Sequence, residues 1–104
     1  GSLNRFAYFN YMKNAQQLKK YKDVKSFGEY FNVTDSILND YKQYALSDSI
    51  HLNLKDSLVK QQIEKQIKVL TARQIWSTEG FYEINNRYDE SVKKALDYLR
   101  QIKK

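Results

Sequence analysis

Proline is absent from this chain of 104 residues, and glycine occurs only three times, once at position 1. Hairpins and tight turns between strands depend on the special backbone angles of glycine and proline, whereas both residues weaken helices. Hydrophobic residues make up 41% of the sequence, enough apolar surface for one buried core. The composition therefore predicts an all-α fold, a small bundle of about five helices.

The first two residues, Gly1 and Ser2, resemble the remnant of a cleaved purification tag, because no initiator methionine precedes them. We therefore expect residues 3–104 to form a single helical domain that is a fragment of a larger protein. No apolar run reaches the roughly 18 residues that a membrane-spanning helix needs. We expect no membrane span in this fragment.

Apolar residues recur at the three- and four-residue spacing of amphipathic helices along most of the chain. The longest periodic run extends from about residue 53 to residue 76 and predicts a long central helix. Further helices are predicted over about 3–21, 26–31, 35–46 and 78–84, and from 89 onward, the last with Val92, Ala95, Leu96, Leu99 and Ile102 on one face.

Several helix starts are predicted from side chains that can accept hydrogen bonds from amides of the first turn. Ser26, followed three residues later by Glu29, fits a capping box. Thr34 is expected to cap the helix that runs to about residue 46. Ser77 or Thr78 can cap the short helix, and Asp89 the last one.

Residues with catalytic or metal-binding chemistry are few. Cysteine is absent and His51 is the only histidine, so a zinc site would need almost entirely carboxylate ligands. Asp48 and Ser49 lie beside His51, but catalytic triads are assembled from separate segments of a fold. Glu79 and Glu83 share a helical face without an evident pocket that would raise a pKa. The sequence predicts no catalytic, cofactor-binding or metal-binding residue.

The chain is basic, with 18 Lys and Arg against 12 Asp and Glu, a net charge of +6. Positive clusters attract phosphates and acidic surfaces. However, only four arginines are available to read base edges, and most lysines lie opposite the apolar stripes. Binding of nucleic acid or of an acidic protein partner is therefore the alternative function, through the cluster Lys13, Lys19, Lys20, Lys22 and Lys25.

Nine tyrosines are a high number for this length, and tyrosine suits interfaces because an apolar ring carries a polar tip. Arg73 interrupts the apolar end of the long helix and is interpreted as a structural clamp rather than a catalytic group. The residues predicted to be structural or to form an interface are Tyr8, Tyr11, Arg73, Trp76, Phe81 and Tyr82.

Three segments in order, 70–76 (LTARQIW), 79–85 (EGFYEIN) and 89–96 (DESVKKAL), resemble the far C-terminal region of bacterial tail-specific (carboxy-terminal processing) serine proteases. Residues 31–35 and 44–45 are similar to the part that precedes it. Members of that group often have Gly after the Trp, where this chain has Ser77.

The resemblance implies a periplasmic or envelope-associated parent, with a PDZ domain and a Ser/Lys dyad that both lie outside this chain. The chain itself would be a non-catalytic accessory domain that contributes to domain packing, substrate access or assembly. Its partners would be the other domains of the parent protease, and protein substrates or a second copy of itself are further possibilities.

Overall fold

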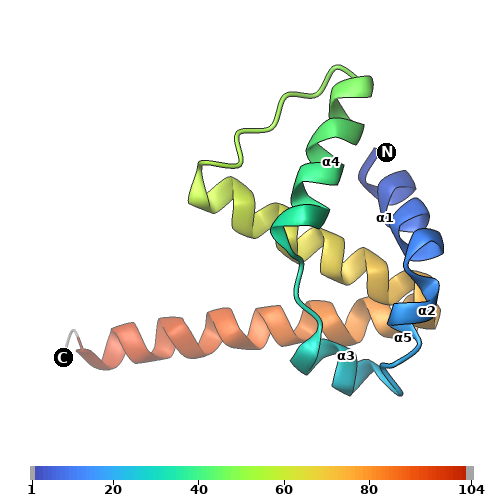
Figure 1. Ribbon diagram of the computed structural model, residues 1–104. Helices are drawn as coiled ribbons and strands as arrows, with labels where there is room; N and C mark the ends of the chain where they lie inside the picture. The colour runs from blue at the N-terminus through green and yellow to red at the C-terminus, as the bar shows by residue number, and fades with distance from the viewer. Residues whose placement is uncertain (1, 103–104) are drawn as a thin grey trace.

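The structure is a computed structural model that describes residues 2–102, and every regular element within that range is a helix (Figure 1). The elements are α1 (Ser2–Lys13), α2 (Ala15–Leu18), α3 (Val24–Tyr30), α4 (Asp35–Ser47) and α5 (Ser57–Ile102). The predicted all-α fold with one long helix is confirmed. Gly1, half of the expected tag remnant, lies outside the described residues.

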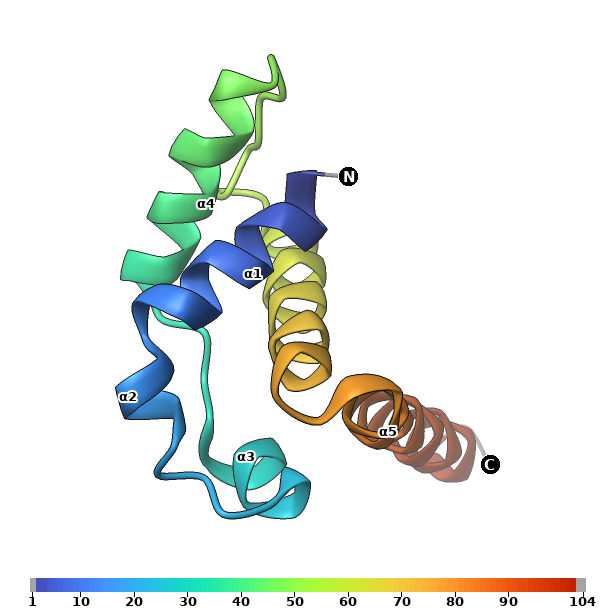
Figure 2. The same cartoon turned by 90° about the vertical axis from the view of Figure 1, so that its right-hand side faces the viewer.

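Helix α5 is bent at Ser77, whose backbone angles of φ 59° and ψ −146° are not helical. We call residues 57–76 the first arm and residues 78–102 the second arm. Gly80 makes the bend possible, because a Cβ atom there would lie 2.5 Å from the carbonyl oxygen of Ala72. Figure 2 shows the two arms running in different directions from this point.

One core cluster lies where α1 and α4 pack against the first arm of α5. The buried residues there are Phe6 from α1, Leu38, Tyr41 and Ala45 from α4, and Ile67 from the first arm. The ring centroids of Phe6 and Tyr41 are 5.1 Å apart. This contact joins two helices between which α2 and α3 lie in the sequence. It fixes how α1 and α4 lie side by side (Figure 2).

The second core cluster is aromatic and holds α2 and α3 against the bend of α5. Phe27 is fully buried, stacks on Phe31 at 4.6 Å and meets the edge of Trp76 at 5.5 Å between ring centroids. Ile84, also fully buried, brings the second arm into the same cluster. Both arms of α5 therefore contribute to the core.

The helix predicted over residues 3–21 is wrong, because it breaks at Asn14 and continues only as the short α2. The Asn14 side-chain amide donates to the backbone carbonyl of Asn10 and to its Oδ1, both at 3.0 Å. Asparagine side chains compete for backbone groups in this way and so end helices. Periodicity alone does not detect this competition.

The capping box at Ser26 is also wrong. The N-cap of α3 lies three residues earlier, at Asp23, whose Oδ1 accepts a 2.8 Å hydrogen bond from the Ser26 amide. The cap predicted at Thr34 is confirmed, since its hydroxyl oxygen accepts from the Ile37 amide at 3.2 Å. The long helix begins at Ser57 rather than near residue 53, because Asp56 accepts from the first-turn amides.

No helix begins at Asp89, which is an exposed residue within the second arm, and the two helices predicted after Ser77 are one. Without proline or a second glycine in this stretch, nothing interrupts the backbone hydrogen bonds. The stripe Val92, Leu96 and Leu99 does not join the core, since every residue from 89 to 101 is exposed. The side chain of Ile102 lies outside the described part of the chain.

Candidate functional site

A cleft of about 330 Å³ lies between α1 and α2 on one side and the start of α4 on the other. Its wall is rich in side-chain amides and hydroxyls, and apolar side chains form the rest of it. The polar lining residues include Asn10, Asn14, Gln17, Asn32, Thr34 and Ser36. Leu18, Tyr21, Phe31 and Ile37 supply the apolar part. Such a mixture of apolar wall and placed polar groups is typical of ligand sites.

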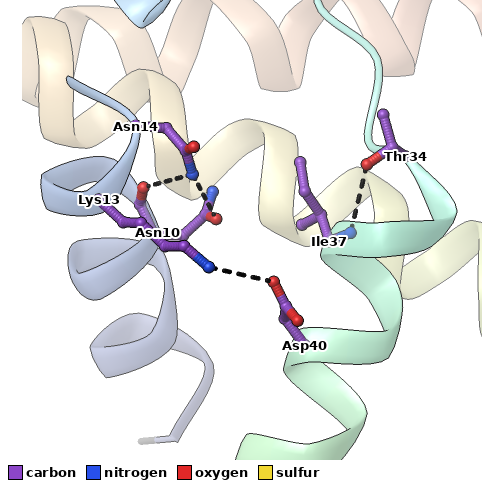
Figure 3. Close-up of polar contacts among 6 residues, drawn as sticks. All are labelled: Asn10, Lys13, Asn14, Thr34, Ile37 and Asp40. Carbon is purple, nitrogen blue, oxygen red and sulfur yellow. Dashed lines mark hydrogen bonds and ion pairs between the residues drawn. The ribbon is translucent and has the colours of Figure 1, made fainter. Parts of the chain in front are cut away.

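Asn10 is the most buried polar residue of the cleft, with 6% of its surface exposed. Its Oδ1 is occupied by the hydrogen bond from Asn14, so its Nδ2 is left as a donor on the side of α1 that faces α4 (Figure 3). Within the described residues, every buried side-chain nitrogen and oxygen has a partner, so this Nδ2, which donates no hydrogen bond there, is open to solvent in the cleft. An accessible amide donor in a cleft can bind an acceptor supplied from outside.

Lys13 and Asp40 face each other across the opening, with 3.9 Å between Nζ and Oδ2 (Figure 3). Both side chains are more than half exposed, so this pair contributes little to stability and can open for a ligand. The hydroxyl of Thr34 caps α4 at the same place. The ion pair places one positive and one negative charge at the mouth of the cleft.

Four exposed lysines, which we call the lysine patch, lie between the C-cap of α2 and the first turn of α3: Lys19, Lys20, Lys22 and Lys25. Lys20 itself lines the cleft, and its ammonium lies 5.2 Å from the ring centroid of Tyr21. Within residues 2–102, none of the four forms an ion pair. Lys13 and Lys20 bring positive charge to the lining of the cleft, and Lys19, Lys22 and Lys25 are close to Lys20 in the sequence.

The six residues predicted to be structural or interfacial lie elsewhere, and none lines the cleft. Tyr11 and Trp76 are half-buried against the aromatic core, as is Phe81. The guanidinium of Arg73 is exposed and lies 5.9 Å from the Phe81 ring centroid, so it spans the bend between the two arms. Tyr8 and Tyr82 are exposed.

The residues weighed for catalysis do not converge. His51 is exposed in the segment between α4 and α5, and Asp48 binds Arg5 at 2.7 Å. Ser49 has a φ of 61° and follows the end of α4, where the Ile50 amide donates to the Ala45 carbonyl. That bond is characteristic of a helix terminus. Within the described residues, no group of three or more His, Cys, Asp or Glu could hold a metal ion.

The amides of the cleft were not predicted, although the sequence contains a signal for them. Asn10, Asn14 and Gln17 are spaced by four and then three residues, which places them on one stripe of a helix. Lys13 lies next to this stripe. A run of amides at helical spacing beside a lysine is the pattern that would have indicated the site.

The fold and the cleft together define a small helical module with a partly polar cleft. Residues 1–77 match a family model described as a family of unknown function (DUF8443). Because the match covers well over half of the chain, the protein belongs to this family. The matched region ends at Ser77, the residue at which α5 bends. No curated protein and no solved structure matches the chain.

The resemblance to tail-specific proteases is wrong, since the family found over residues 1–77 is a different one and no match relates the chain to a protease C-terminal region. Amphipathic helices resemble each other because the same spacing of apolar and charged residues recurs in all of them. The expected periplasmic location depended on that resemblance alone and loses its basis with it. Within residues 2–102, no helix is long and apolar enough to cross a membrane.

Proposed function

We propose that this protein is a non-catalytic helical module that binds an acidic segment of a partner protein in the cleft between α1, α2 and α4. One observation supports the proposal: the side-chain amide of Asn10 offers a donor to a cleft whose lining includes Lys13 and Lys20. Charge-assisted hydrogen bonds from lysine to carboxylate are stronger than neutral ones. A segment containing Asp or Glu would satisfy both features.

The rest of the lining suits a polypeptide. Amide side chains both donate and accept, so Asn14, Gln17 and Asn32 can bind the N–H and C=O groups of a peptide backbone. Tyr21 and Phe31 offer apolar surface for an adjoining side chain. The proposed site thus combines hydrogen bonds to any peptide backbone with a preference, due to its lysines, for acidic side chains.

Two features favour a peptide over nucleic acid. Asp40 lies in the cleft, and its carboxylate can accept a hydrogen bond from a peptide backbone N–H, a donor that a phosphate group does not have. The chain also has only four arginines, and none of them lines the cleft. Arginine is the side chain that most often reads bases and grips phosphates bidentately.

The test is a fluorescence anisotropy titration of the full chain with labelled Glu- and Asp-rich peptides, neutral peptides of equal length and single-stranded oligonucleotides. We expect the acidic peptides to bind most tightly, with an affinity that falls as salt is raised. Lys20→Glu should weaken that binding by about tenfold or more, which corresponds to about 1.4 kcal/mol.

Lys55→Glu is the matched control, because it makes the same charge change at an exposed residue outside the cleft. Equal effects of the two substitutions would mean that net charge alone attracts the peptide, and the cleft would then have no role. Tighter binding of the oligonucleotides than of any peptide would replace the proposal by nucleic-acid binding.

A further inference from the structure

The last part of the second arm, residues 89–102, which we call the extension, projects away from the bundle (Figure 1). It carries a stripe of exposed apolar side chains. Val92, Leu96 and Leu99 are 59%, 50% and 52% exposed. They are spaced by four and three residues, so they lie on one face of the helix, with Ala95 beside them. This spacing is that of the seam between paired helices.

The projection is also visible in the dimensions of the molecule. The radius of gyration is 15.1 Å, whereas a compact domain of about 100 residues has one near 13 Å. The last fully buried side chain of the second arm is Ile84. A free helical extension gains little from propensity alone, and most helical stability in proteins comes from packing of an apolar face. The extension therefore lacks the contact that would stabilise it within one chain.

We propose that a second copy of this chain covers the stripe, with the two extensions side by side and antiparallel. The charges carry this assignment. Asp89 and Arg100, eleven residues apart, lie on the same flank of the stripe. Antiparallel copies that cross near Ala95 place Asp89 of one copy close to Arg100 of the other, whereas parallel copies place like charges together.

Ala95 near the middle of the stripe supports the same arrangement. A small residue at the crossing lets two helices approach closely, while Val92 and Leu99 on either side provide apolar contact. The opposite face carries charges of both signs, with Glu90 and Asp97 among Lys93 and Lys94. Helices that lie on membranes instead have a polar face rich in lysine and arginine. The pairing does not depend on the proposed function of the cleft, which lies elsewhere.

The first experiment is sedimentation equilibrium of the full chain over a range of concentrations. We expect a reversible dimer, and Leu96→Lys combined with Leu99→Lys should weaken the dimer by at least about tenfold in Kd. Gln101→Lys is the control, since it adds a lysine to the face of the same arm that lies opposite the stripe. Both substituted leucines are half exposed in the single chain, so circular dichroism should show an intact bundle.

Orientation is tested by spin labels, which is straightforward because the chain has no native cysteine. In an antiparallel pair, labels at Lys94→Cys lie close to each other. Labels at Gln101→Cys are farther apart, by about 20 Å along the axis at 1.5 Å per residue. Equal separations at the two positions would indicate parallel helices and overturn the proposal.

A chain that stays monomeric at every concentration would also overturn it, as would a dimer that survives the double leucine substitution. Vesicles of anionic lipid are the remaining arm of the test. A monomer that binds these vesicles through the same leucines would assign the stripe to a membrane surface instead.

Discussion

The ammonium group of Lys68 on the first arm donates a 2.8 Å hydrogen bond to the carbonyl oxygen of Gly28 in α3. That carbonyl belongs to the last turn of α3, where backbone acceptors have no partner within the helix. From the second arm, Arg87 approaches Glu29 of α3 to 3.8 Å. The short α3 is therefore held by both arms of α5, one on each side of the bend.

Lys68→Met should lower the free energy of unfolding by about 1–2 kcal/mol, because a hydrogen bond to a charged group is lost while the aliphatic stem is kept. Equilibrium unfolding in urea measures the change. Lys93→Met at an exposed position is the control and should leave stability within about 0.5 kcal/mol. Equal stability of the two variants would show that the Lys68 contact does not stabilise α3.

Wild type and Lys68→Met should also differ in how the free energy of unfolding depends on pH. Burial, and then the charge of Arg87, lower the pKa of Lys68 below its ordinary value of 10.5. Between the lowered pKa and 10.5 the unfolded chain binds more protons than the folded one, so the free energy of unfolding rises with pH in that window. The difference in unfolding free energy between wild type and Lys68→Met should therefore grow as the pH approaches 10.5.

The titration of Tyr88 changes the free energy of unfolding in the opposite direction. Its contribution cancels when wild type is compared with Lys68→Met. Burial, and then the charge of Glu64, raise the pKa of Tyr88 above 10.0, so its contribution to stability is lost as the pH rises above that value. Both proteins contain Tyr88. A wild-type advantage that shrinks between neutral pH and pH 10 would contradict the lowered pKa of Lys68.

The two small residues of the bend should respond in opposite directions. Ser77→Gly should raise the free energy of unfolding by about 1 kcal/mol, since φ 59° and ψ −146° strain every residue except glycine. Gly80→Ala should lower it by about 1–3 kcal/mol, because the new Cβ would press on the backbone of Ala72. Thermal unfolding of the two variants ranks them, and the reverse order would mean that the bend differs from the one described.

Side chains near the start of the second arm should stabilise the bundle, whereas side chains near its end should not. Ile84 is fully buried, so Ile84→Ala should cost about 2–5 kcal/mol. Leu96→Ala, at an exposed site, should change the stability of the single chain by less than about 0.5 kcal/mol. Urea unfolding at a concentration below dimerisation compares them. A large loss for Leu96→Ala under these conditions would place that leucine inside the bundle.

Substitutions at the start of α3 test whether Asp23 or Ser26 is the N-cap. Asp23→Ala should cost about 1 kcal/mol, because the Ser26 amide loses its acceptor. Ser26→Ala should cost no more than a few tenths of a kcal/mol, since the Ser26 hydroxyl is not the cap. Unfolding of both variants under the same conditions decides between the two residues, and a larger loss for Ser26→Ala would restore the capping box.

The candidate site could be predicted only in part. The lysines were singled out by their density in the sequence, and two of them, Lys13 and Lys20, line the cleft. Asn10 was not singled out, because an asparagine in an amphipathic helix has the same local sequence pattern whether it faces solvent or a neighbouring helix. Its burial depends on α4, which begins 25 residues later at Asp35.

The sequence by itself determined the features that depend on one or two turns of chain: the helical class, the cap at Thr34, and the end of the first arm at Trp76. These follow from backbone propensities and local hydrogen bonds, which need no distant partner. The tertiary structure alone decided which apolar stripes are covered. Ile84 and Leu96 occur in similar helical patterns, yet only Ile84 has α3 opposite it, because burial is a property of what lies across from a side chain.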